Sequence, residues 1–117
     1  MTQVSKPVVR ELQDVLDLDR TIHEPARLVI LAVLNALESA DFTYLMDQTR
    51  MTQGNLSAHL SKLETAGYIS ITKSFEAKRP RTTLRITPAG TAQLIAHARK
   101  LSRFITMIGV KPEKTRK

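Results

Sequence analysis

The chain has 117 residues, 42% of them hydrophobic and 25% charged, which is the composition of one ordinary globular domain. The net charge of +7 is unevenly spread: residues 1–50 hold five Lys or Arg against eight Asp or Glu, whereas residues 51–117 hold thirteen against three. The basic half is the expected contact surface for a polyanion. Cysteine is absent, which excludes disulfides, thiolate metal sites and thiol nucleophiles.

A first amphipathic helix is predicted within residues 1–18, beginning near Pro7. Its apolar side holds Val8, Leu12 and Val15 at helical spacing. Such a helix can pack on its own domain or on a partner chain, so we expect a role in dimerisation.

A second helix is predicted to begin with Pro25 in its first turn and to continue to about Glu38. It is apolar nearly all round and must be covered on more than one side, which in so short a chain indicates a dimer. Residues 39–41 interrupt the pattern, and Thr43 is predicted to cap a short third helix that runs to about Thr49.

Thr52 is predicted to cap a fourth helix, about fourteen residues long, that Gly67 ends in the left-handed conformation. Leu56, Leu60 and Leu63 share its buried side. The opposite side carries small residues, which let a backbone approach a DNA major groove, and polar residues that can reach base edges or phosphates. The candidate DNA contacts of this helix are Thr52, Gln53, Asn55, Ser57, Ser61 and Lys62. A solvated face without any partner would have a similar composition.

A β-hairpin is predicted next, with strands Tyr68–Ser74 and Thr82–Ile86 around the loop 75–81. Five basic residues oppose only Glu76 within residues 73–85. Such a finger can lie along a phosphate backbone or place an arginine in a narrow minor groove. The candidate contacts at its tip are Lys78, Arg79 and Arg81. The alternative is a basic hairpin that only protects a sheet edge from aggregation.

The last helix is predicted over residues 88–109, after a cap at Thr87 and with Pro88 in its first turn. Its apolar residues recur at spacings of four, three, four and three, which is typical of a coiled-coil seam. The predicted dimer interface consists of Leu94, Ala98, Leu101, Ile105 and Ile108 together with Val8, Leu12 and Val15. Residues 110–117 form a basic tail that we expect to be disordered, and residues 19–87 remain as the DNA-binding core.

The histidines His23, His59 and His97 lie far apart in sequence and have no acidic or thiol companions at ligand spacing. We therefore expect no metal site and no cofactor, and we interpret His59 as a packing and hydrogen-bonding residue. The sequence contains no Ser/His/Asp grouping, phosphate-binding glycine loop or HExxH motif, so we expect no catalytic site and no enzyme activity.

The N-terminal segment lacks the apolar core of a signal peptide, and no run approaches the roughly 18 to 20 apolar residues that span a bilayer. We therefore expect a cytoplasmic protein without a membrane partner.

The order helix, helix, turn, helix, hairpin, helix resembles the winged helix-turn-helix regulators of bacteria and archaea, in particular the MarR/ArsR-like group. The resemblance covers about residues 20–105 and is carried by Asn-Leu-Ser-x-His-Leu-x-x-Leu-Glu-x-x-Gly at 55–67 and by Pro-Arg-Thr at 80–82. It implies a mainly α fold with a small β-hairpin (α+β) and a dimer that represses or activates transcription. The cysteine motif of metal-sensing ArsR proteins is absent, and the chain is shorter than typical MarR proteins.

The resulting hypothesis is a sequence-specific, homodimeric regulator that binds double-stranded DNA. Helix 52–66 would read the major groove, and the basic hairpin 73–85 would contact the backbone or the minor groove. One alternative is an interaction module that docks a protein on the surface of Gly54, Ala58 and Ser61. Another is a protein that coats chromosomal DNA without sequence preference. Whether the protein binds a small-molecule effector stays open.

Overall fold

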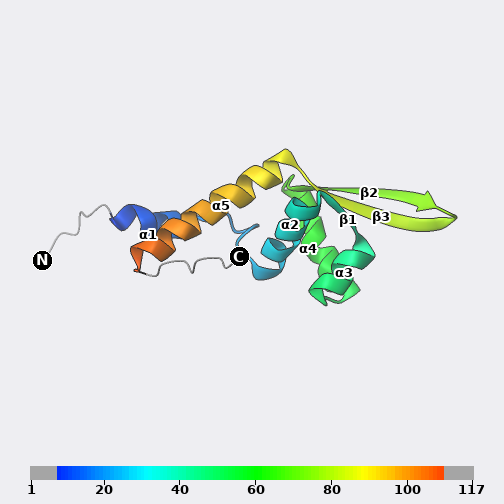
Figure 1. Ribbon diagram of the computed structural model, residues 1–117, viewed down its shortest axis with the longest axis horizontal. Coiled ribbons are helices and arrows are strands. Elements are labelled where there is room, and N and C mark those ends of the chain that lie inside the picture. Colours follow the sequence, from blue (N-terminus) through cyan, green and yellow to red (C-terminus); the bar gives the residue numbers. More distant parts are fainter. Residues whose placement is uncertain (1–7, 110–117) are drawn as a thin grey trace, which may run out of the picture.

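The computed structural model describes residues 8–109, which form five helices and a three-stranded sheet (Figure 1). In chain order the elements are α1 (Val8–Leu16), α2 (Pro25–Leu37), β1 (Ser39–Asp41), α3 (Phe42–Thr49), α4 (Gln53–Thr65), β2 (Ile69–Glu76), β3 (Arg79–Ile86) and α5 (Pro88–Met107). None of these helices is both long and apolar enough to cross a bilayer. The predictions for Pro7 and for the tail 110–117 lie outside the described residues.

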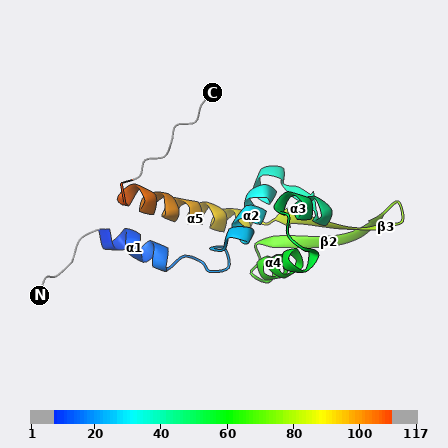
Figure 2. The ribbon, with the colours of Figure 1, turned by 90° about the horizontal axis from the view of Figure 1, so that it is seen from below.

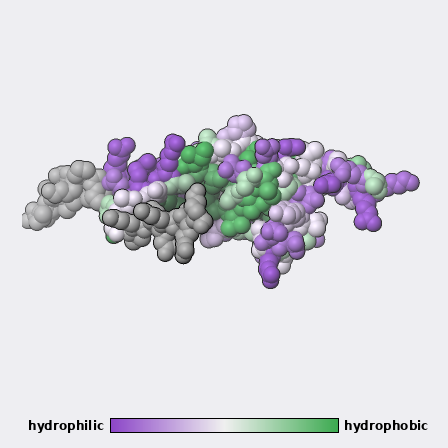
Figure 3. All heavy atoms as spheres, in the orientation of Figure 1, coloured by the Kyte–Doolittle hydropathy of each residue, from purple (hydrophilic) through white to green (hydrophobic). Residues whose placement is uncertain are grey.

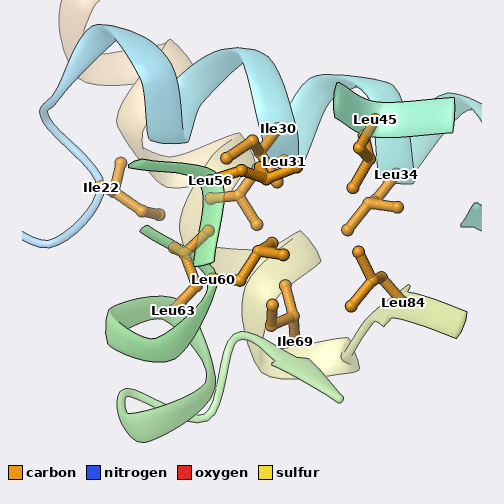
Figure 4. Packing of buried hydrophobic residues seen from close by; sticks show 10 residues of the cluster. All are labelled: Ile22, Ile30, Leu31, Leu34, Leu45, Leu56, Leu60, Leu63, Ile69 and Leu84. Carbon is orange, nitrogen blue, oxygen red and sulfur yellow. The ribbon is translucent and has the colours of Figure 1, made fainter. Parts of the chain in front are cut away.

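The hydrophobic core lies where α2, α3, α4 and the base of the hairpin meet (Figure 4). Leu56, Leu60 and Leu63 are all buried, as the predicted stripe on the fourth helix requires. They pack against side chains from the other elements, namely Ile22, Ile30, Leu31, Leu34, Leu45, Ile69 and Leu84. Because each fully buried side chain contributes about 1.5–3 kcal/mol relative to exposure, this cluster fixes how α4 is presented.

The sheet has the antiparallel order β1-β3-β2. β1 was not predicted, because three residues are too few to show an alternating pattern. It is a strand only through its pairing with β3, in which Ala40 lies opposite Leu84 and Asp41 opposite Thr83. The predicted hairpin is thereby joined at its base to the start of α3.

The hairpin is longer and tighter than the sequence indicates. The predicted seven-residue loop is wrong: pairing continues out to Glu76 and Arg79, and only Ala77 and Lys78 form the turn. Both turn residues have positive φ, 51° and 67°. Two-residue turns of this kind favour Asn-Gly, and Ala-Lys gives no such signal, so the sequence pattern does not reveal the turn.

The helix caps agree with the sequence except at α3. Asp41 caps α3, because its carboxylate accepts a hydrogen bond from the Tyr44 amide at 2.7 Å, and the prediction of Thr43 is wrong by two positions. A carboxylate on an extended residue can reach the amide three positions on, and Thr43 is already helical. Thr52 caps α4 by accepting from the Asn55 amide at 3.1 Å, and Gly67 has the predicted left-handed conformation with φ 85°.

α5 is attached to the base of the hairpin and lies alongside α1. Its cap Thr87 donates from its amide to the Tyr68 carbonyl at 3.0 Å and from its hydroxyl to the Gly67 carbonyl at 2.6 Å. Asp14 of α1, which is half-buried, and the exposed Arg103 of α5 form an ion pair at 3.6 Å. The α1–α5 pair and the hairpin extend from opposite ends of the helical core (Figure 2).

Candidate nucleic-acid interface

The outer side of α4 is exposed along its whole length. All six candidate contacts of this helix are solvent-exposed: Thr52, Gln53, Asn55, Ser57, Ser61 and Lys62. The side chains of Gln53 and Asn55 make no hydrogen bond with another residue in the range 8–109. Between them lies Gly54, around which no heavy atom comes within 4 Å of a Cβ position. This side of α4 therefore presents polar groups among small side chains, and no other part of residues 8–109 covers it.

Lys78 and Arg79 project from the hairpin tip, and both are exposed. Within the described part of the chain, neither has a carboxylate within 4.0 Å. Hydrophilic residues gather over the far end of the hairpin (Figure 3). The hairpin therefore carries uncompensated positive charge away from the core.

Arg81 differs from Lys78 and Arg79 because it forms ion pairs within the protein. Its guanidinium contacts the Glu76 carboxylate at 2.9 Å and the Asp41 carboxylate at 3.5 Å. Asp41 is also the cap of α3, so Arg81 connects the hairpin to the start of that helix. Such exposed ion pairs contribute at most about 1 kcal/mol, so a phosphate can compete for Arg81 at modest cost.

The outer side of α4 and the hairpin face one open concavity of about 800 Å³. Gln53, Ser57 and Ser61 line it from α4, and Arg79 and Arg81 line it from the hairpin. The structure thus brings five of the nine candidate DNA contacts into one space. The remaining four, Thr52, Asn55, Lys62 and Lys78, lie outside that lining.

Among the other residues that line this concavity are two polar ones that the sequence does not single out as DNA contacts. Lys73 lines it from β2, and Thr43 lines it from the first turn of α3. Lys73 carries the signal of a basic residue in the hairpin. Thr43 carries none, because its position depends on how α3 packs beside the sheet.

His59 has the packing role that the sequence indicates. Its side chain is 22% exposed, and its Nδ1 accepts a hydrogen bond from Arg27 Nε at 3.1 Å. This bond joins α4 to the first turn of α2. His59 is therefore held by a neighbouring helix at the flank of the leucine stripe.

His23 and His97 are neighbours in space although they lie far apart in sequence. His23 Nδ1 and His97 Nε2 are 3.3 Å apart, which joins the segment before α2 to the middle of α5. Burial, and then the proximity of His23, hold the pKa of His97 below its usual value. Residues 8–109 contain no group of three or more His, Cys, Asp or Glu side chains that could hold a metal ion.

Tyr68 and Asp19 form a second polar contact at this junction. The Tyr68 hydroxyl donates to the Asp19 carboxylate, and burial together with this carboxylate raises the pKa of Tyr68 to about 12. Burial acts to raise the pKa of Asp19, but hydrogen bonds from Tyr68 and from the amides of Thr21 and Ile22 hold it below its usual value. The segment before α2, the base of β2 and α5 are thus held together by polar bonds.

The predicted dimer residues on α1 and α5 differ in exposure. Leu94 packs against the protomer's own core, and Leu101 is half-buried. Leu12, Ile105 and Ile108 are 44%, 40% and 54% exposed. The α1–α5 pair therefore presents apolar side chains to the outside of the protomer.

Residues 26–105 match the family described as winged helix DNA-binding domain. The chain is 42% identical over 64 residues to an uncharacterized protein of Methanocaldococcus jannaschii, a match that covers 55% of this chain and 70% of that protein. The family match over residues 26–105, together with the architecture, confirms the predicted winged helix fold and family.

Among solved structures, the chain resembles a transcriptional regulator homologue from Pyrococcus horikoshii, with a TM-score of 0.79 and 28% identity over 86% of this chain and 99% of that one. It also resembles the transcriptional repressor CouR bound to a 23-mer DNA duplex, with a TM-score of 0.63 and 23% identity over 87% of this chain and 75% of that one. At the latter identity the likeness concerns the fold.

Proposed function

The chain belongs to the family of winged helix DNA-binding domains, and from this premise we propose that it is a sequence-selective transcriptional regulator acting as a homodimer. The observation that carries the proposal is the concavity shared by the outer side of α4 and the hairpin. If α4 lies in the major groove and the hairpin follows the phosphates, the sugar-phosphate backbone between them would occupy this concavity. The transcriptional regulator homologue and the DNA-bound repressor among the similar structures support the same function.

Sequence selectivity is proposed to come from α4. Gln53 and Asn55 lie in its first turn, where the amide side chains can form paired hydrogen bonds with adenine in the major groove. The exposed Gly54 and Ala58 let the helix backbone approach the base edges. Asn55→Ala should therefore relax the preference at one base position by about 1–3 kcal/mol.

Phosphate binding is proposed to come from the hairpin and from the N-terminus of α4, whose unpaired amides favour anions. Lys78 and Arg79 need give up no internal ion pair within the described residues. Arg81 must release Glu76 and Asp41 first. Arg79→Ala should flatten the dependence of log K on log salt by about one unit, and Arg81→Ala by less.

Homodimerisation is proposed through the apolar side chains that the α1–α5 pair leaves exposed. A two-fold dimer would place two α4 helices at half-sites about one helical turn, roughly 34 Å, apart. Ile108→Glu puts a charge at a position that is already 54% exposed, so the protomer should remain folded. Light scattering should then report a monomer, and a variant that remains dimeric would remove this surface from the proposal.

The test of the function is selection of bound fragments from sheared genomic DNA, followed by competition with random-sequence duplex. The proposal expects enrichment of a two-fold symmetric site that random DNA displaces poorly. Equal displacement by random DNA would instead indicate a protein that coats DNA. Only weak association that salt abolishes would indicate a module that docks other proteins. A cytoplasmic location stays a prediction of the sequence.

A further inference from the structure

Phe75, near the tip of the hairpin, is 77% exposed, the most exposed large hydrophobic side chain in the described part of the chain. Nothing in the proposed phosphate contacts uses it. Single exposed hydrophobic residues are common on protein surfaces, so exposure alone assigns no role. Its surroundings on the hairpin supply the argument.

The register of the hairpin places Phe75 directly opposite Pro80. The pair that closes a two-residue turn, here Glu76 and Arg79, is hydrogen-bonded, so the next pair is of the non-hydrogen-bonded kind, in which side chains lie closest. The missing amide hydrogen of Pro80 then points outward and leaves no bond unmade. Phe75 and Pro80 thus form one compact apolar pair, which we name the tip pair.

The tip pair lies on the side of the hairpin that faces α4. Side chains alternate along a strand, so Phe75 shares its side of β2 with Ile71, which packs against the core, and Pro80 shares its side of β3 with the buried Leu84. Pro80 also lines the concavity into which Gln53 and Ser57 project. Pro80 and the outer side of α4 therefore border the same space, and Phe75 lies directly beside Pro80 on the same side of the hairpin.

The reach of the hairpin matches the spacing of the grooves. Phe75 lies four residues beyond Ile71 along β2, about 13 Å at 3.3 Å per residue, and Glu76 at the turn lies about 17 Å beyond Ile71. Half a turn of duplex, the separation between a major groove and the next minor groove, is also about 17 Å. With α4 in the major groove, the turn of the hairpin reaches the minor groove beside it, and the tip pair lies one residue pair before that turn.

The tip carries charge and strain that suit this position. Lys78 and Arg79 flank the tip pair, which favours a polyanion over an uncharged protein surface. Ala77 and Lys78 hold left-handed conformations that disfavour side-chain-bearing residues, and such strain gathers at binding sites. Apolar side chains that enter a minor groove and contact sugars or base steps are an established mode of DNA binding.

We propose that Phe75, backed by Pro80, is a nonpolar minor-groove contact of the hairpin tip. The inference rests on the proposed function and adds to it a contact that is not electrostatic. It makes the hairpin a reader of groove width and of the minor-groove amino group of guanine, in addition to an anchor on phosphates.

The test compares the full chain with Phe75→Ala, Phe75→Leu and Ser74→Ala on the selected duplex, by fluorescence anisotropy at three salt concentrations. Ser74 is the matched control because it is exposed on the opposite side of the same strand. Phe75→Ala should weaken binding about tenfold at every salt concentration without changing the salt slope, because no counterion is released by a nonpolar contact. Phe75→Leu should lose less than Phe75→Ala, and Ser74→Ala should bind like the parent chain.

A second arm exchanges A·T pairs under the hairpin for G·C and for inosine·C pairs. The guanine amino group should weaken binding by the parent chain, inosine should restore it, and Phe75→Ala should be insensitive to both. Unchanged affinity of a folded Phe75→Ala protein for the duplex overturns the inference. The inference is also overturned if this variant loses only oligomer formation, or only binding to anionic lipid vesicles, while it still binds the duplex like the parent chain. Failure of the parent chain to bind any duplex would overturn the proposed function itself, which is a separate result.

Discussion

Gly90 lies in the first turn of α5, where the helix touches the base of the hairpin. A Cβ added there would lie 2.2 Å from the Tyr68 carbonyl oxygen and 2.9 Å from Ile86 Cγ1. Ordinary contact begins at 3.4 Å, so the carbonyl would have to move by about 1.2 Å (3.4 minus 2.2). That carbonyl accepts the Thr87 amide at 3.0 Å and cannot move without weakening this bond.

The magnitude for Gly90→Ala follows from these contacts. Overpacking costs about 1–3 kcal/mol, a weakened hydrogen bond costs about 1 kcal/mol, and better helix propensity returns at most about 1 kcal/mol. The expected net loss is about 2–3 kcal/mol, which lowers the Tm of a domain of this size by roughly 10–20 °C.

The matched control is Gly54→Ala, which adds the same methyl group in α4 with no heavy atom within 4 Å. It should raise stability by up to about 1 kcal/mol. Both changes are measured by urea and thermal unfolding followed by circular dichroism. A Gly90→Ala protein within about 0.5 kcal/mol of the parent chain would refute the account of how α5 is seated.

Three further predictions concern the other contacts. The pKa of His97 is lower in the folded chain than in the unfolded chain, so the unfolded chain binds a proton at His97 more readily. The free energy of unfolding should therefore fall as the pH drops through about 6.5. His97→Gln should reduce this pH dependence, measured by urea unfolding at several pH values. Ala77→Asn combined with Lys78→Gly places residues that favour positive φ at both turn positions and should raise the free energy of unfolding by about 1 kcal/mol. A Tm below that of the parent chain would contradict this prediction. Asp41→Ala removes both the α3 cap and a partner of Arg81 and should cost about 1 kcal/mol in thermal unfolding, whereas Arg79→Ala should cost less than about 0.5 kcal/mol.

The helices could be predicted because their signals are local. The leucine stripe on α4 and the caps Thr52 and Thr87 depend on residues within one or two turns, so spacing alone places them. β1 could not be predicted, since its three residues become a strand only when β3 lies beside them. The turn at Ala77 and Lys78 was missed because neither residue is the type that such a turn favours.

The candidate site divides along the same line. The exposure of Gly54, Ala58 and Ser61 could be predicted, because the helical wheel places them opposite the leucine stripe. The pairing of Arg81 with Glu76 and Asp41 depends on the register of two strands with β3, which the sequence does not reveal. The contact between His23 and His97 depends on how α5 returns past the segment before α2.

We propose that the outer side of α4 and the hairpin tip bind one duplex together. The most direct measurement is an amide NMR titration of the isotope-labelled chain with the selected duplex at about 150 mM salt. The account predicts that the largest saturable shift changes map to residues 53–62 of α4 and to residues 73–82 of the hairpin. Changes confined to the basic residues of α5, with α4 and the hairpin unaltered, would contradict it.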